Sequence, residues 1–226
     1  MSVLGVIPAR GGSKGIPRKN LRLMAGLPLI AWTIKSAMEC RLLDRLIVST
    51  EDPEIAEIAI HYGAEVPFLR PIELADDQST TKDVMMHALG VLPDFEFFAL
   101  LQPTSPLRLP IDIEAALNLA QSGQVSSVVS ICLASEHPEW QYRIGRDGVL
   151  SPFAKPGQTT RRQDLTSSYV LNGAVYVRNS KLFLRDGTFV RKGTVGFVMP
   201  RDRSIDVDDE LDWFIAEALM KRREDG

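Results

Sequence analysis

A short segment near the start of the chain is rich in both glycine and basic side chains. It reads ARGGSKGIPRKN and contains Gly11, Gly12, Gly15, Arg10, Lys14, Arg18 and Lys19. Glycines let backbone N–H groups approach an anion, and basic side chains neutralise its charge. Because an apolar run precedes the segment and an amphipathic pattern follows it, we expect a strand, a loop and a helix N-terminus. The segment predicts a site for a phosphate or a nucleotide.

The order of residues in this segment argues against two common nucleotide-binding motifs. A P-loop requires GxxxxGK followed by Ser or Thr, and a dinucleotide fingerprint requires GxGxxG, whereas the chain has GGSKG. A kinase or other P-loop NTPase is therefore disfavoured. A plain glycine turn would leave the concentration of basic residues unexplained.

A second cluster, SIDVDDELD, is acidic and lies at a predicted strand–helix junction. Asp206 and Asp208 are two positions apart, so in an extended segment both carboxylates point to the same side. Mg²⁺ takes one or two protein carboxylates and completes its shell with water and phosphate oxygens. The cluster predicts a magnesium site. The alternative is a helix N-terminus stabilised by acidic residues in its first turn.

Two polar loops add further candidates. In LLQPTSPLR, prolines stiffen the loop that presents Gln102, Thr104, Ser105 and Arg108. In LRPIELADDQSTTKDV, a hydroxyl of Ser79, Thr80 or Thr81 could cap the next helix. Arg70 has no evident structural role there.

Composition narrows the class of protein. The 226 residues are 45% hydrophobic and 24% charged, as in an ordinary globular protein. The net charge of −3 gives no electrostatic basis for binding nucleic acid. Cys40 and Cys132 are too far apart for a metal motif. Because the start does not resemble a signal peptide and no apolar stretch reaches the ~20 residues of a membrane span, we expect a cytoplasmic protein.

Apolar runs typical of strands alternate with helical patterns along the first part of the chain. We expect strands at residues 3–7, 45–49, 66–69, 97–101 and 127–132, and helices at 29–38, from 53 onward, at 81–92 and at 111–120. This rhythm predicts an α/β protein with a mainly parallel sheet covered by helices on both faces. Ligands bind beyond the carboxyl ends of such strands, so the glycine-rich loop and LLQPTSPLR should share one edge.

The alternation stops after residue 133. Residues 134–170 are rich in proline, glycine and charge, with isolated aromatics, and we expect an arm inserted into a domain formed by 1–133 and 171–226. Regular patterning resumes with strands at 173–177 and 195–199 and a closing helix at 209–221.

Five motifs in fixed order, IPARGGSKGIPRKNL, LRPIELA, LQPTSPLR, NGAVY and SIDVDDELD, resemble the CMP-sialic acid synthetase (acylneuraminate cytidylyltransferase) family. The resemblance covers residues 3–220. It implies a Rossmann-like three-layer nucleotidyltransferase fold with a dimerisation arm, and a homodimer. It also implies Mg²⁺-dependent transfer of CMP from CTP to the anomeric hydroxyl of a nine-carbon 2-keto sugar acid, with release of pyrophosphate.

The resemblance implies roles for particular residues. The nucleotide would be bound by Arg10, Ser13, Lys14, Lys19, Asn20, Arg70, Ser79 and Thr81. The sugar acid would be bound by Gln102, Asn172, Tyr176 and, from the arm, Arg162. Asp206 and Asp208 would hold the metal, and the catalytic set would be Arg10, Lys19 and Asp208. Because an alcohol attacks a phosphate, positioning and charge neutralisation suffice and no protein nucleophile is needed.

One position departs from the family pattern, because Val170 stands where an arginine often precedes NGA. Arg161 or Arg162 could compensate for this loss. The identity of the sugar acid therefore stays open among sialic, legionaminic, pseudaminic and ketodeoxynononic acids. The eight-carbon acid Kdo is disfavoured, because the related enzymes that use it have a different glycine-rich loop. Two other hypotheses are a nucleotidyltransferase for another sugar or base and a non-catalytic nucleotide-binding module. The retained loop cations and the Asp206–Asp208 pair argue against the module.

Overall fold

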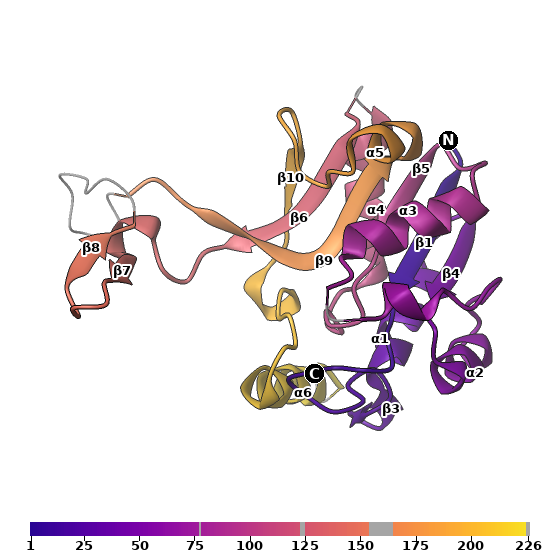
Figure 1. Ribbon diagram of the computed structural model, residues 1–226, viewed down its shortest axis with the longest axis horizontal. Helices are drawn as coiled ribbons and strands as arrows, with labels where there is room; N and C mark the ends of the chain where they lie inside the picture. The colour runs from indigo at the N-terminus through magenta and orange to yellow at the C-terminus, as the bar shows by residue number, and fades with distance from the viewer. Residues whose placement is uncertain (77, 123–124, 154–164, 225–226) are drawn as a thin grey trace.

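A six-stranded, mostly parallel sheet forms the centre of the protein (Figure 1). The computed structural model describes residues 1–226 except 77, 123–124, 154–164 and 225–226. The strand order is β10-β6-β9-β5-β1-β4. The strands are β1 (Val3–Pro8), β4 (Arg45–Ser49), β5 (Phe97–Leu100), β6 (Ser127–Leu133), β9 (Tyr169–Asn179) and β10 (Val195–Val198). β9 runs antiparallel to β5 and β6, and the other pairs are parallel, which confirms the predicted mainly parallel α/β fold.

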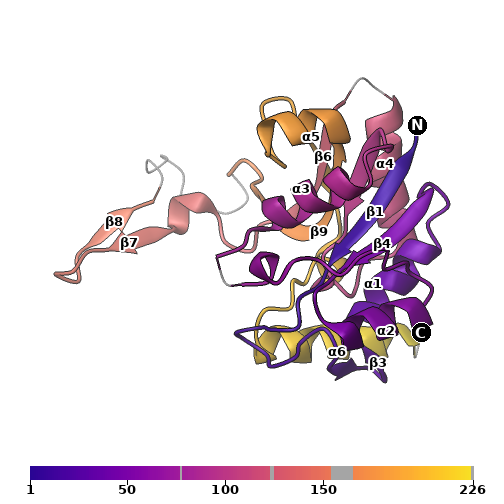
Figure 2. The same cartoon turned by 45° about the vertical axis from the view of Figure 1, so that its right-hand side comes forward.

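Helices cover both faces of this sheet. The helices are α1 (Leu29–Met38), α2 (Pro53–His61), α3 (Thr81–Val91), α4 (Pro110–Ser122) and α5 (Ser180–Asp186). Alternation along β1 creates two cores: Val3 and Ile7 pack with α1, α2 and α4, whereas Leu4 and Val6 pack with α3 and α5. Figure 2 shows these two groups of helices on opposite sides of the sheet. Each fully buried aliphatic side chain of this kind contributes about 1.5–3 kcal/mol.

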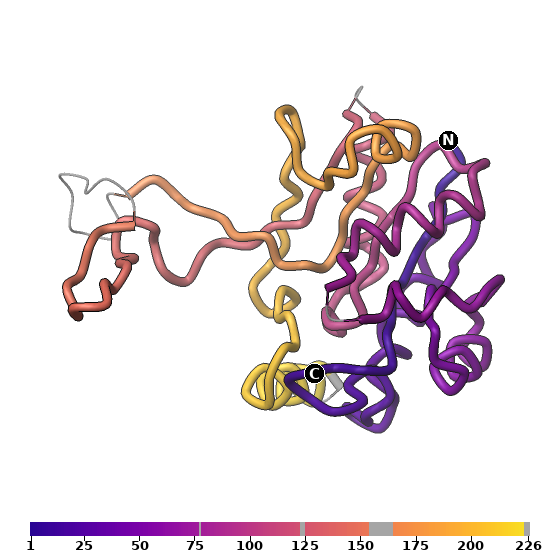
Figure 3. The backbone as a smooth tube through the Cα atoms, viewed as in Figure 1, coloured from indigo at the N-terminus to yellow at the C-terminus, as the bar shows by residue number. Residues whose placement is uncertain are grey.

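A third core ties the end of the chain to its beginning. The closing helix α6 (Glu210–Glu224) buries Trp213 against Ile16 and Met24, which lie in and after the glycine-rich segment. Met24 belongs to a hairpin of β2 (Leu23–Met24) and β3 (Leu27–Pro28) that precedes α1. Figure 3 traces α6 alongside this N-terminal region. Packing of α6 therefore places the acidic segment next to the cationic loop.

The segment between β6 and β9 leaves the sheet. It contains a short helix η2 (Pro138–Trp140) and a ribbon of β7 (Tyr142–Ile144) and β8 (Leu150–Pro152). The ribbon projects away from the rest of the chain (Figure 1, Figure 2). Two other short helices are η1 (Ile72–Leu74) and η4 (Arg201–Arg203). None of the helices in the described ranges is long and apolar enough to cross a bilayer.

The expected strand at 66–69 does not form. Glu65 and Leu69 make single bridges to Ile47 and Thr50 instead of a continuous ladder. Pro67 lies between them and has no backbone N–H to donate, so a regular edge strand is interrupted there.

Candidate active site

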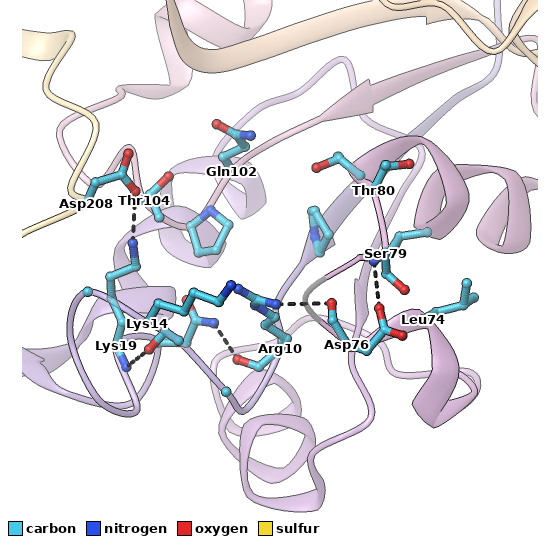
Figure 4. Close-up of a pocket in the computed structure, with 18 of the residues that line it drawn as sticks. Arg10, Lys14, Lys19, Leu74, Asp76, Ser79, Thr80, Gln102, Thr104 and Asp208 are labelled. Atoms are coloured by element: carbon cyan, nitrogen blue, oxygen red, sulfur yellow. Dashed lines mark hydrogen bonds and ion pairs between the residues drawn. The ribbon is translucent and has the colours of Figure 1, made fainter. Parts of the chain in front are cut away.

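A cavity of about 480 Å³ opens beyond the carboxyl ends of the central strands. Four stretches of sequence line it: the glycine-rich loop, the approach to α3, the loop after β5 and the segment before α6 (Figure 4). The predicted residues that meet here are Arg10, Ser13, Lys14, Lys19, Asn20, Arg70, Ser79, Thr81, Gln102, Asp206 and Asp208. We call this space the main cavity.

The glycine-rich loop is held in shape by its own side chains. Asn20 Nδ2 donates to the carbonyl oxygen of Arg10 at 2.9 Å, and Ser13 Oγ accepts from the backbone N–H of Lys19 at 3.1 Å. Asn20 Oδ1 is buried without a hydrogen-bond partner among the described residues. Since a buried acceptor of this kind normally finds a donor, it is available to a ligand.

The loop glycines have different roles from those expected. A Cβ on Gly15 would collide with the carbonyl oxygen of Asp208, and one on Gly11 would collide with the Asp52 side chain. The N–H of Gly11 donates to Glu51 Oε1 at 2.7 Å, so it is committed to this carboxylate and not to a ligand in the main cavity. Among the loop glycines, Gly12 and Gly15 line the main cavity. Close chain approach, as much as anion binding, therefore requires glycine here.

Arg18 also differs from the prediction. It pairs with Glu54 at 2.6 Å and with Asp52 at 3.4 Å, and it is not among the residues lining the main cavity. The loop cations that line the cavity are Arg10, Lys14 and Lys19.

Glu51, which the sequence analysis assigned no role, links two walls of the cavity. Its Oε2 accepts from Arg70 Nε at 3.0 Å and from Arg70 Nη2 at 2.8 Å, while Oε1 holds Gly11. Burial lowers the pKa of the Arg70 guanidinium, and the charge of Arg10 adds to this, whereas Glu51 opposes it. The position of Glu51 two residues after the end of β4, at the ligand-binding edge, was the available signal.

The helix N-terminus at the cavity belongs to α3 and not, as expected, to α1. The β2–β3 hairpin separates the loop from α1, and no residue of α1 appears in the described lining. Thr80 caps α3 in a capping box with Asp83, as predicted for one of the three hydroxyls. The hydrogen bonds from Thr80 lower the pKa of the Asp83 carboxyl. Ser79 and Thr81 flank the cap and face the cavity with it.

The two carboxylates before α6, Asp206 and Asp208, both line the main cavity. Burial raises the pKa of the Asp206 carboxyl, and the charge of Asp208 adds to this, whereas a hydrogen bond from Thr104 opposes it. Asp206 Oδ1 is buried with no partner among the described residues. A divalent cation would satisfy this oxygen and offset the repulsion between the carboxylates. The described residues contain no cluster of three or more metal-ligating side chains, so water and phosphate would complete the shell.

A second cavity of about 490 Å³ adjoins the first and shares Thr80, Thr81 and Gln102 with it. Tyr176 lines this second cavity, and burial followed by the charge of Asp206 raises the pKa of its hydroxyl. Gly173 has φ +74°, and a Cβ there would lie 2.5 Å from Gln102 Oε1, so the glycine of NGAVY lets Gln102 approach the strand.

Among the described residues, one predicted sugar-acid residue, Asn172, lines neither cavity. Asn172 is buried and accepts from Ser130 Oγ at 2.6 Å while its Nδ2 donates to Ser204 Oγ at 2.9 Å. Arg162 and the neighbouring Arg161 lie outside the described residues.

The mostly parallel sheet, its two layers of helices and the cavity at its carboxyl edge define a three-layer α/β protein with the Rossmann-like nucleotidyltransferase fold. Two solved structures share this fold. One is CMP:2-keto-3-deoxy-manno-octonic acid synthetase complexed with CTP, with TM-score 0.77, 16% identity, and coverage of 99% of this chain and 100% of that one. The other is 4-diphosphocytidyl-2C-methyl-D-erythritol synthase from Anaerococcus prevotii, with TM-score 0.70, 14% identity, and coverage of 98% and 96%.

The chain belongs to the cytidylyltransferase family, whose family model matches residues 4–137. It is 39% identical to the CMP-N,N'-diacetyllegionaminic acid synthase of Legionella pneumophila, over 98% of this chain and 97% of that protein. It is 32% identical to the pseudaminic acid cytidylyltransferase of Campylobacter jejuni, over 98% of this chain and 97% of that protein. It is 32% identical to the N-acylneuraminate cytidylyltransferase of Escherichia coli over 98% of this chain but about half, 52%, of that protein. These matches confirm the family that the motifs indicated.

Proposed function

We propose that the protein transfers CMP from CTP to the anomeric hydroxyl of a nine-carbon 2-keto sugar acid of the sialic or legionaminic type, releasing pyrophosphate. The observation that carries this proposal is the pair of adjoining cavities. One is lined by Arg10, Lys14 and Lys19 and suits a triphosphate. The other shares Gln102 with it and offers room for an acceptor beside the nucleotide. The names of the relatives support CMP transfer to a nonulosonic acid.

In this reaction the anomeric oxygen forms a bond to the α-phosphorus of CTP. The bond from that phosphorus to the oxygen bridging to the β-phosphate breaks, pyrophosphate leaves, and the hydroxyl proton is lost to a base. Arg10, Lys14 and Lys19 would stabilise the charge that develops on the departing pyrophosphate. Mg²⁺ held by Asp206 and Asp208 would supply further neutralisation of the triphosphate when bound. Catalysis then rests on positioning two anionic substrates together.

We assign the remaining predicted residues by their place around the cavities. Arg70, Ser79 and Thr81 would contact the cytidine, and Ser13 and Asn20 the ribose or phosphates. Gln102 and Tyr176 would face the sugar acid. Asn172, whose amide is engaged by neighbouring side chains, would position Gly173 rather than touch the acid. Arg162 would approach the acid's carboxylate or the phosphates from the arm.

We also propose that the protein is a homodimer, with an arm at 134–170 inserted into a body formed by 1–133 and 171–226. The ribbon of the arm exposes Tyr142, Ile144, Leu150 and Phe153, each more than half accessible to solvent. Apolar side chains concentrated on a projecting ribbon favour association. Sedimentation at micromolar concentration tests this, and a monomer would contradict it. The reaction would take place in the cytoplasm, in keeping with two buried free cysteines.

The central experiment measures pyrophosphate release with CTP and Mg²⁺ and a panel of N-acetylneuraminate, N,N'-diacetyllegionaminate and pseudaminate. We expect release with at least one acid, with CTP and not with UTP or GTP. Release with another nucleotide alone would indicate a different nucleotidyltransferase. CTP binding without release for any acid would indicate a non-catalytic nucleotide-binding module.

A further inference from the structure

The second cavity contains a charged side chain for which the reaction has so far supplied no role. Among the described residues that line this cavity, Lys82 is the charged one, and the rest are apolar or uncharged polar. Leu171, Phe189 and Val190 supply much of the apolar surface. The proposed acceptor is an acid, so its binding site needs a cation for the carboxylate.

Lys82 is held at the cavity by both helices that border it. It is the second residue of α3, two positions after the Thr80 cap, and it reaches the end of α5 at Gly187. Gly187 has φ +60°, and a Cβ there would lie 2.8 Å from Lys82 Nζ. The absence of a side chain at Gly187 therefore leaves space for the Lys82 side chain to lie across this edge of the cavity.

The ammonium group of Lys82 is available to a ligand. In the described part of the chain no carboxylate forms an ion pair with it. The nearest acidic neighbour in sequence, Asp83, accepts hydrogen bonds from the N–H and the hydroxyl of Thr80 at 3.1 and 2.6 Å. Its carboxylate is thereby committed to the helix cap.

The position expected to carry a carboxylate-binding arginine offers no alternative. Val170 occupies that position, is about half exposed, and is not among the residues lining the second cavity. We propose that Lys82 binds the carboxylate of the acceptor sugar acid and so performs the task of the missing arginine, which would leave the phosphates to Arg162, a residue outside those the structure describes. This inference rests on the proposed function, since it requires a sugar acid as acceptor.

The test compares Lys82→Met with the unaltered enzyme in pyrophosphate release. We expect KM for the accepted sugar acid to rise about ten- to a hundredfold, as for loss of a hydrogen bond to a charged group, with KM for CTP unchanged. Lys82→Arg should retain most of the affinity. Lys181→Met is the matched control, because Lys181 is an exposed lysine of α5 that lines neither cavity. A KM within twofold of the unaltered value in Lys82→Met would overturn the inference.

A second measurement isolates the carboxylate. The methyl ester of the accepted acid lacks the negative charge, so as a competitive inhibitor it should have the same inhibition constant for the unaltered enzyme and for Lys82→Met. An ester that also loses affinity in the variant would show that Lys82 contacts another part of the sugar. If the unaltered enzyme releases no pyrophosphate with any acid, the proposed function fails. The role of Lys82 is then tested by calorimetric titration of the unaltered protein and of Lys82→Met with the same acids. Equal affinities of the two proteins for every acid would overturn the proposed contact as well.

Discussion

The ammonium group of Lys19 lies 3.2 Å from Asp208 Oδ1, although the two residues are 189 positions apart in the chain. The same group donates to the carbonyl oxygen of Val207 at 2.6 Å. Lys19 thus joins the glycine-rich loop to the Asp206–Asp208 segment. Movement of either segment would displace both Lys19, which we propose stabilises the leaving pyrophosphate, and the candidate metal ligands.

Replacing Lys19 with Met should reduce kcat by about a hundredfold or more, because charge stabilisation of the leaving group is lost. Arg10→Ala should have a similar effect. Both variants should still fold, because both side chains line a cavity and not a core, but Lys19→Met also loses the bonds to Val207 and Asp208 and should lower the unfolding temperature more than Arg10→Ala. Steady-state pyrophosphate release and thermal unfolding check this together. Near-normal turnover in either folded variant would contradict the assignment of the loop.

Asp208→Ala should abolish turnover while leaving the fold intact, since the Asp208 side chain is 76% exposed. If the carboxylate holds Mg²⁺, the more conservative Asp208→Asn should require a higher Mg²⁺ concentration for half-maximal activity. Magnesium titration of residual activity measures this shift. Unchanged Mg²⁺ dependence in an active Asp208→Asn variant would remove Asp208 from the metal site.

Glu51→Gln should destabilise the protein and weaken CTP binding. The change leaves the Arg70 guanidinium, 3% exposed, without its charged partner, and loss of one member of a buried pair costs about 3–5 kcal/mol. Glu65→Gln is the control, because its partner Arg45 is 30% exposed, and such surface pairs contribute about 0–1 kcal/mol. Denaturant unfolding and KM for CTP should separate the two variants. Equal losses of unfolding free energy in Glu51→Gln and Glu65→Gln would show that the buried Arg70 pair stabilises the fold no more than a surface pair does.

Asp83→Ala should lower stability through loss of the capping box on α3, by about 1 kcal/mol at neutral pH. The pKa of Asp83 is depressed by Thr80, so its contribution is fully present above the ordinary pKa of 3.8 and is lost as the pH falls through the depressed value. The difference between Asp83→Ala and the unaltered protein should therefore shrink on acidification. Unfolding curves from pH 7 down to pH 3 measure it. A difference that grows on acidification would contradict the assignment.

The sequence correctly predicted the strands, helices and caps that form through contacts between residues close together in the chain. The alternation in β1, the helix at α1 and the Thr80 cap follow from periodicity and short-range hydrogen bonding, which are written in adjacent residues. The glycine-rich loop and the Asp206–Asp208 pair were recognisable because their residue types are concentrated in short stretches. The strand expected at 66–69 does not form, because Pro67 has no backbone N–H to donate even though its neighbours are apolar.

The tertiary structure decided those features of the site that depend on contacts between residues far apart in the chain. The β2–β3 hairpin lies between the loop and α1, so the helix N-terminus at the main cavity is that of α3. Ile16 of the loop packs in the same core as residues of α6, a contact that residue order does not specify. Glu51 acquired its role only when folding brought Gly11 and Arg70 to its two oxygens. Lys82 likewise lies at the second cavity because Gly187, more than a hundred positions away, has no side chain and leaves room for it.

The sequence by itself therefore determined the fold class and the family and supplied the candidate residues for phosphate and metal, because these depend on composition and spacing within short motifs. Only the tertiary structure decided which of these candidates share a cavity, which form bonds with one another, and which cation lines the second cavity. The physical reason is that hydrogen bonds and ion pairs act over about 3–4 Å, a separation that the folded chain sets and that residue order does not specify.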